Sequence, residues 1–142
     1  MPIPEEFRFY TRRVLIVDDE KAMANAIRRT LRSAGLETQI ALDGFQAGTK
    51  LMSFMPAVMT LDLQMPGLDG FELLEFVRSE AAISKVKVLV ISALPESDLQ
   101  RALEVGANDV LEKPFSNETL VEKVAVLLGE QVGVIREVND PG

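Results

Sequence analysis

The chain has 142 residues, of which 47% are hydrophobic and 26% charged, and this balance is typical of one folded globular domain rather than a disordered segment. The formal net charge of −7 argues against nucleic-acid binding, because no basic stripe is visible that would displace counterions from phosphates. Cysteine and histidine are absent, which excludes disulfides, thiolate nucleophiles, Ser-His-Asp catalysis and metal sites built on either residue.

Strands and helices alternate along the predicted chain. Each predicted strand is a short apolar run, and the runs cover 14–17, 38–41, 57–61, 86–91 and 108–111. A helix with an apolar period of 3.6 residues follows each run, and four of these helices have a predicted stop at Gly35, Pro56, Gly106 and Gly129. Asp69 and Glu72 have the spacing of a capping box, and Ser116 is the predicted N-cap of the last helix.

Five strands that are mostly apolar on both faces predict a parallel sheet covered by helices on both sides, which is an α/β architecture. The carboxyl ends of parallel strands lie at one edge of the sheet, and ligands bind at that edge in open α/β folds. Polar residues stand at four of these ends: Asp18 and Asp19, Asp62, Ser92 and Lys113. We therefore expect these side chains to form one site.

The three aspartates predict a site for a hard divalent cation. Taken alone, Asp18 and Asp19 before a helix are typical of capping and dipole pairing. Asp62 changes that interpretation, because three adjacent carboxylates repel one another and would raise one another's pKa. Mg²⁺ relieves this repulsion and keeps waters for an incoming phosphate, with Asp19 and Asp62 as expected direct ligands and Asp18 acting through water.

Asp62 is also the candidate nucleophile, because a carboxylate can attack a phosphoryl group to form an acyl phosphate. Ser92 would donate its hydroxyl to a phosphoryl oxygen, and Lys113 would add a positive charge. Either residue alone is more often a helix cap or a solvated surface charge, so the interpretation depends on their being together. Pro114 permits a cis bond that would aim the Lys113 ammonium inward, and Phe115 is expected to pack into the core.

These residues resemble the receiver domains of bacterial two-component response regulators over roughly 13–129. The matching motifs, in the family's order and spacing, are Val17-Asp18-Asp19-Glu20, Asp62 with Met65-Pro66-Gly67 and Asp69-Gly70, Ser92-Ala93, Gly106-Ala107, and Lys113-Pro114-Phe115. The resemblance implies a flavodoxin-like (βα)5 fold, a doubly wound parallel five-stranded sheet with strand order 2-1-3-4-5.

The resemblance also implies a function. Asp62 would be phosphorylated by a sensor histidine kinase or a histidine phosphotransfer protein, so the domain would be a signalling phosphoacceptor rather than an enzyme. Mg²⁺, for which Mn²⁺ could substitute, would be bound by Asp18, Asp19, Asp62 and the Gln64 carbonyl. The other implied roles are phosphate binding and switching by Ser92, Ala93 and Lys113, and structural turns at Pro66, Gly67 and Pro114.

One position departs from the family pattern. An aromatic residue that turns inward on activation often stands three residues before the lysine, and here that position is Val110. The phosphorylated state would then be read through Ser92, the loop after it and backbone shifts in the fourth helix. A partner, or a second copy in a homodimer, would meet the surface formed by the fourth helix, the fifth strand and the last helix.

The two ends of the chain are predicted to lie outside the receiver domain, as a linker at 1–12 and a tail at 130–142. The linker resembles the segment before the receiver in regulators with an N-terminal excisionase-like or MerR-like DNA-binding domain, which would make transcription the regulated output and place that domain outside this chain. A single-domain regulator that acts by protein contacts is the alternative. No signal peptide and no apolar run of the ~20 residues of a membrane span are visible, so a cytoplasmic location is expected.

The same residues are compatible with two other functions. A receiver-like module that binds partners without phosphorylation is disfavoured, because the acid pair, the acceptor, the hydroxyl and the lysine are all present. A haloacid-dehalogenase-like phosphatase also uses an aspartate nucleophile after a strand. The motif of that class is Asp-x-Asp, and Gln64 stands here at the position of the second acid.

Overall fold

The computed structural model describes residues 12–139, with side chains described through Gly129. Its main sheet has five parallel strands in the order β2-β1-β3-β6-β7. These strands are β1 (Arg13–Val17), β2 (Glu37–Ala41), β3 (Val58–Leu61), β6 (Lys87–Ser92) and β7 (Asp109–Glu112). Because β6 and β7 are the fourth and fifth strands of this sheet in chain order, the predicted strand order and the flavodoxin-like class are confirmed.

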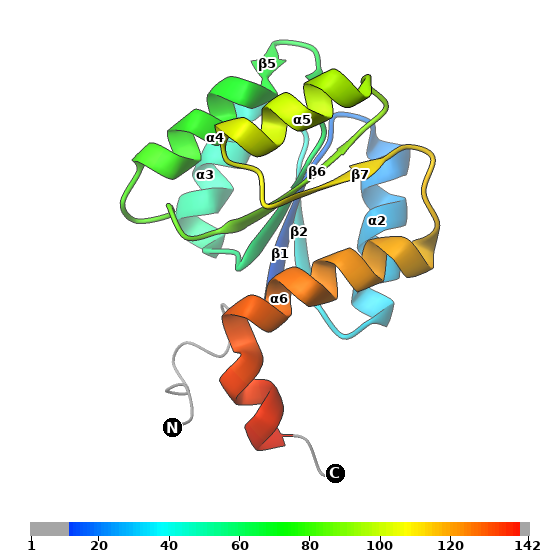
Figure 1. Ribbon diagram of the computed structural model, residues 1–142, viewed down its shortest axis with the longest axis vertical. Helices are drawn as coiled ribbons and strands as arrows, with labels where there is room; N and C mark the ends of the chain where they lie inside the picture. Colours follow the sequence, from blue (N-terminus) through cyan, green and yellow to red (C-terminus); the bar gives the residue numbers. More distant parts are fainter. Residues whose placement is uncertain (1–11, 140–142) are drawn as a thin grey trace.

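Helices cover both faces of the sheet (Figure 1). One face carries α3 (Gly44–Phe54), α4 (Gly70–Ser79) and α5 (Glu96–Val105), and the other carries α2 (Lys21–Ser33) and α6 (Asn117–Asn139). Successive residues of β1 alternate between the two cores: Leu15 and Val17 pack under α3, α4 and α5, whereas Val14 and Ile16 pack under α2 and α6. The pleat sends neighbouring side chains to opposite faces, so a strand with helices on both sides is apolar throughout.

Side-chain caps fix where two helices begin. The Asp69 carboxylate accepts hydrogen bonds from the Phe71 and Glu72 backbone N–H groups at the start of α4. At the start of α6, the Ser116 hydroxyl accepts one from the Thr119 N–H at 3.1 Å. Both caps were predicted, and each satisfies N–H groups that the first turn of a helix leaves without a partner.

The segment between Asp62 and α4 folds back on itself. It forms a two-stranded antiparallel hairpin of β4 (Gln64–Met65) and β5 (Leu68–Asp69), with Pro66 and Gly67 as its two-residue loop. Gly67 has a φ of +74°, which suits the third position of a type II turn. The predicted turn is therefore present, and the short strands beside it were not foreseen.

The prediction that the last helix ends near Gly129 is wrong, because α6 continues to Asn139. A glycine ends a helix readily when it adopts a left-handed conformation, as Gly35 and Gly106 do with φ values of +90° and +142°. Gly129 has no positive φ and stays helical. A glycine inside a helix costs only about 1 kcal/mol relative to alanine, so a single glycine does not by itself end a helix.

None of the helices in the part of the chain that the structure describes has both the length and the apolarity needed to cross a membrane.

Candidate functional site

The carboxyl edge of the main sheet brings together the polar residues that follow β1, β3, β6 and β7. The backbone pairing of the sheet continues into this edge: the Asp62 N–H donates to the Val17 carbonyl, and the Lys113 N–H donates to the Ser92 carbonyl, both at 3.0 Å. The residues beyond the strand ends are therefore held by the same ladders that hold the strands. The structure thus brings the three aspartates and Lys113 together, as the strand ends predicted, and holds Ser92 next to Lys113 through the backbone.

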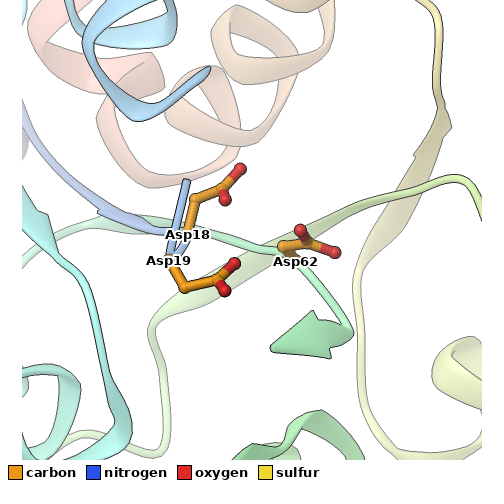
Figure 2. A group of neighbouring side chains, drawn as sticks. All are labelled: Asp18, Asp19 and Asp62. Atoms are coloured by element: carbon orange, nitrogen blue, oxygen red, sulfur yellow. The ribbon is translucent and has the colours of Figure 1, made fainter. Parts of the chain in front are cut away.

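Three carboxylates lie side by side at this edge (Figure 2). Asp18, Asp19 and Asp62 each offer a carboxylate oxygen, and these oxygens all lie within 4.8 Å of one another. Asp18 and Asp62 are buried, with exposed fractions of 2% and 7%, whereas Asp19 is exposed. The oxygen-only donor set and its close spacing fit a hard divalent cation, which would replace mutual repulsion with attraction.

Lys113 supplies the positive charge of the site. Its Nζ lies 3.2 Å from Asp62 Oδ2 and 3.6 Å from Asp18 Oδ2, and its side chain is 17% exposed. The Lys113-Pro114 peptide bond is cis, as the sequence permitted. Phe115, which follows, packs against the core under α2 and α6, as expected. The site thus contains one cation against three carboxylates.

Backbone N–H groups fix the orientation of the two buried carboxylates. Asp18 Oδ1 accepts from the Glu20 N–H, and Asp62 Oδ1 accepts from the Gln64 N–H, both at 2.9 Å. In each case the aspartate bonds the backbone two residues later, a local turn that holds the side chain in one rotamer. The second oxygen of each carboxylate remains directed at Lys113.

Burial raises the pKa of the Asp18 carboxyl above its usual value near 3.8. Repulsion from Asp62 and Asp19 acts in the same direction, while the hydrogen bond from Glu20 and the charge of Lys113 oppose the rise. The sequence predicted that repulsion would raise the pKa values of these acids, but desolvation is the larger cause at Asp18. A bound cation would lower the cost of keeping this carboxylate charged.

Ser92 lies at the end of β6 and is completely buried. Its Oγ accepts a hydrogen bond from the Leu94 N–H at 3.1 Å, which is the ordinary capping role of a serine after a strand. That bond uses an oxygen lone pair and leaves the hydroxyl proton for another acceptor. Ala93, next in the chain, is exposed.

Val110 lies in β7 opposite Val90 of β6 and is half-buried against the core under α3, α4 and α5. Its short aliphatic side chain has no ring that could swing between an outward and an inward position. The aromatic side chain that is usual at this position in the family is therefore replaced by a valine in the structure, as the sequence showed.

Gly70 has a packing role that the sequence did not reveal. A Cβ built at this position would lie 2.7 Å from Leu63 Cδ2 and 3.2 Å from Leu63 Cα. A side chain at this position would displace the Leu63 side chain and crowd its backbone, so glycine lets α4 begin close to the loop that carries Asp62. The sequence signal for this role was the Asp69-Gly70 pair at the start of a helix, but only Asp69 was given a structural role from the sequence.

The fold and the grouped acids, hydroxyl and lysine define a receiver-type signalling domain, and comparison with known proteins agrees. Residues 14–125 match the model of the response regulator receiver domain family. The chain is 32% identical over 117 residues to the DNA-binding dual master transcriptional regulator RpaA of Synechocystis, covering 82% of this chain and 48% of that protein. It is 43% identical to protein-glutamate methylesterase/protein-glutamine glutaminase 5 of Myxococcus xanthus, covering 87% of this chain and 36% of that protein.

Among solved structures, a response regulator receiver domain from Bermanella marisrubri is similar, with 45% identity and a TM-score of 0.79, covering 82% of this chain and 98% of that chain. The chain belongs to the response regulator receiver domain family of two-component systems. It spans about half the length of RpaA.

Proposed function

We propose that Asp62 is the phosphoacceptor of this receiver domain. The observation that carries the proposal is the position of its carboxylate, buried beside Asp18 and Asp19 and 3.2 Å from Lys113 Nζ. An Asp62 oxygen would attack the phosphorus of a phosphohistidine, the P–N bond would break, and the product would be an acyl phosphate and a free imidazole. The proposed donor is a histidine kinase or a histidine phosphotransfer protein, as membership of the receiver domain family implies.

A magnesium ion, with manganese as a substitute, is the proposed cofactor. Asp18, Asp19, Asp62 and the Gln64 carbonyl would hold it, and the excess of three carboxylates over one lysine fits a divalent cation. The ion would neutralise negative charge on the transferring phosphoryl group.

Ser92 and Lys113 would bind the phosphoryl oxygens. The Ser92 hydroxyl has a proton to donate, and moving Lys113 Nζ from the carboxylates to a phosphoryl oxygen would keep its charge compensated. A phosphoryl group favours the closed arrangement only by the difference in its affinity for the two states. With Val110 at the usual aromatic position, we propose that the Ala93 loop and α5 carry the change.

The output of this domain is proposed from its relatives. RpaA is named as a DNA-binding transcriptional regulator, and the Myxococcus relative is named as a methylesterase, so related receiver domains are joined to different outputs. We favour transcription through an N-terminal DNA-binding domain outside residues 13–129, with no direct nucleic-acid contact by the receiver. A cytoplasmic location and a homodimer through α5, β7 and α6 belong to the same proposal.

The phosphatase alternative gains no support from the site. Gln64, two residues after Asp62, is exposed, and an amide cannot exchange protons as a general acid or base. The domain is accordingly proposed to catalyse only its own phosphorylation and dephosphorylation.

Phosphoramidate and Mg²⁺, followed by intact-mass spectrometry, test the assignment. Wild type should gain one phosphoryl group that hydroxylamine removes, because hydroxylamine cleaves acyl phosphates. Asp62→Asn should gain none, and chelation of Mg²⁺ should abolish the gain in wild type. Asp109→Asn is the matched control, because this aspartate pairs with Lys123 at the start of β7 and lies at the opposite edge of the sheet. Equal labelling of Asp62→Asn and wild type would refute the assignment.

A further inference from the structure

Exposed apolar side chains gather on two neighbouring helices. The part of the chain that the structure describes exposes five large hydrophobic side chains, and four of them belong to α3, the residue after it and α4: Phe45, Met52, Met55 and Phe76. Phe45 is 84% exposed. Single exposed hydrophobic residues are ordinary, but a contiguous group is typical of an interaction surface. The flank of each helix that carries these side chains shows whether they form such a group.

Phe45 and Met52 lie on the flank of α3 that is turned away from the edge strand of the sheet. Lys50 donates a hydrogen bond to a carbonyl of β2, and Gln46 accepts one from the Leu42 N–H just after that strand. Because β2 is the outermost strand, the Gln46 and Lys50 flank points toward that edge of the sheet. Phe45 and Met52 are seven residues apart and share one line, roughly 100–160° around the helix from that flank. They therefore point outward and toward the middle of the sheet.

Phe76 lies on the flank of α4 that is turned away from α5. The Phe71 ring centroid lies 3.9 Å from the guanidinium carbon of Arg101 in α5. Arg78 donates a hydrogen bond to the carbonyl of Gly106, which follows α5. Phe76 is roughly 140° around the helix from Phe71 and 160° from Arg78. Since α3 contacts β1 and β2 whereas α5 contacts β6 and β7, the flank of α4 away from α5 faces α3 (Figure 1).

The two flanks thus face each other, and we call Phe45, Met52 and Phe76 the α3–α4 apolar surface. Core packing does not require these three side chains, because other residues fill the inner sides of both helices: Ala47, Leu51 and Phe54 in α3, and Leu73, Leu74 and Val77 in α4. The surface is therefore available to a partner.

The charge around the α3–α4 apolar surface is negative. Lys50 is the only charged residue of α3, and its ammonium is hydrogen-bonded to β2. Arg78 is the only cation of α4, and its N–H groups donate to backbone carbonyls. Three exposed carboxylates border the surface on the α4 side: Glu72, Glu75 and Glu80. Spacings of four residues place Glu72 and Glu80 about one turn to either side of Phe76.

We propose that the α3–α4 apolar surface docks a basic amphipathic helix of a partner protein. Apolar side chains on one side of that helix would cover Phe45, Met52 and Phe76, and flanking lysine or arginine side chains would pair with the carboxylates of α4. A helix fits because α3 and α4 offer only side chains: their backbone groups are already hydrogen-bonded, so no strand can be added to them. The surface is separate from the α5, β7 and α6 surface, so the receiver would hold this partner independently of its output.

A second copy of this chain fits the surface less well. In a two-fold dimer each surface would meet itself, and the Glu72 and Glu80 carboxylates of the two copies would approach without a cation between them. The same carboxylates repel an anionic membrane.

Peptide binding to the full chain tests the proposal. The probe is a synthetic helix of about 18 residues with leucine along one side and lysine along the other. The control peptide has the same composition in scrambled order, so it keeps the charge and loses the apolar side. Fluorescence anisotropy measures both Kd values, and the scrambled peptide should bind at least about tenfold more weakly.

Apolar variants locate the contact. Phe45→Ser and Phe76→Ser should each weaken binding of the amphipathic peptide by about tenfold, because each removes a central apolar contact. Val126→Ser is the matched control, since it removes an exposed apolar side chain from α6, and its Kd should stay within about twofold of wild type. Phosphoramidate should label Phe45→Ser and wild type equally, which shows that the variant is folded.

Charge variants test the basic character of the partner. Glu72→Gln/Glu80→Gln should weaken binding about threefold at low salt and reduce its salt dependence. Glu118→Gln/Glu122→Gln removes two exposed carboxylates from α6 and should do neither. Equal effects of the two double variants would show attraction by net charge alone and would overturn the proposal.

Methyl NMR of the methionines locates the peptide directly. The Met52 methyl resonance should shift on binding, whereas that of Met23 in α2, on the opposite face of the sheet, should not. The proposal is overturned by no binding, by equal affinity for the two peptides, by an equal loss in Val126→Ser, by a shift of Met23 without Met52, or by a wild-type dimer that Phe45→Ser abolishes. Failure of phosphoramidate to label wild type would refute the proposed function alone.

Discussion

Charged side chains form two clusters of contacts at opposite edges of the main sheet, and the two clusters differ in how far their charges are satisfied. At the carboxyl edge, three carboxylates face the single cation of Lys113. At the amino edge, the Arg78 guanidinium donates hydrogen bonds to the carbonyls of Gly106, Ser84 and Val86 and to the side chain of Asn108, over 2.6 to 3.0 Å. Arg78 thus joins α4, the loop before β6 and the turn before β7.

The contrast separates a structural ion from a binding site. Burial disfavours the charged form in both clusters, since it lowers the pKa of Arg78 and raises that of Asp18. Arg78 nevertheless stays charged at neutral pH and has neutral acceptors for its N–H groups, so it requires no further ligand. The carboxyl edge retains excess negative charge, and that excess is what a divalent cation would neutralise.

Removing Arg78 should produce the largest effect. Arg78→Met keeps the aliphatic stem but leaves part-buried carbonyls without donors, and we expect the free energy of unfolding to fall by about 3 kcal/mol. Arg29→Met, which removes an exposed cation from α2, should change it by less than about 0.5 kcal/mol. Urea denaturation at neutral pH measures both. Similar small losses in the two variants would mean that the Arg78 bonds contribute nothing beyond an ordinary surface arginine.

The contrast also shows which features the sequence predicts. Apolar runs ending in polar residues located the strands, and parallel strands bring their carboxyl ends to one edge. Asp18, Asp19, Asp62, Ser92 and Lys113 could therefore be grouped from the sequence alone. The roles proposed for them remain predictions that labelling must test.

Arg78 could not be found in this way. An arginine near the end of a helix resembles a solvated surface charge, and backbone carbonyls leave no signature in a sequence. Its partners come from segments 84–86 and 106–108, which meet only after the chain has folded. The end of α6 was missed for a different reason: a glycine ends a helix when its φ is positive, and the residue type alone does not show whether Gly129 adopts that conformation.

Asp18→Asn tests the carboxyl edge of the sheet, because it removes the free-energy cost of burying a carboxylate there. Without metal at neutral pH, we expect the variant to be more stable than wild type, because burial disfavours the charged form of Asp18. Since burial raises the folded-state pKa of Asp18 above 3.8, its destabilising effect is present above that pKa and disappears as the pH falls through it. The stability difference between the two proteins should therefore shrink on acidification.

Asp19→Asn is the matched control for that measurement, because it removes the same charge from an exposed position. It should give a smaller gain without metal, while both variants should lose part of the stabilisation that Mg²⁺ gives wild type. Thermal unfolding from neutral to acidic pH, with and without Mg²⁺, measures all of these quantities. An Asp18→Asn variant less stable than wild type at neutral pH would show that Lys113 and Glu20 outweigh burial.

The smallest effect concerns a polar group on the strand that leads to the site. Thr60 of β3 is 1% exposed, and within the described chain its hydroxyl has no hydrogen-bond partner. Thr60→Val keeps the side-chain shape and removes the unsatisfied group, so the free energy of unfolding should rise by about 0.5 kcal/mol. Phosphoramidate labelling should be unchanged, because the substitution adds and removes no charge. A stability loss with slower labelling would instead show that the hydroxyl acts on Asp62, two residues later, and that the site extends below the carboxyl edge of the sheet.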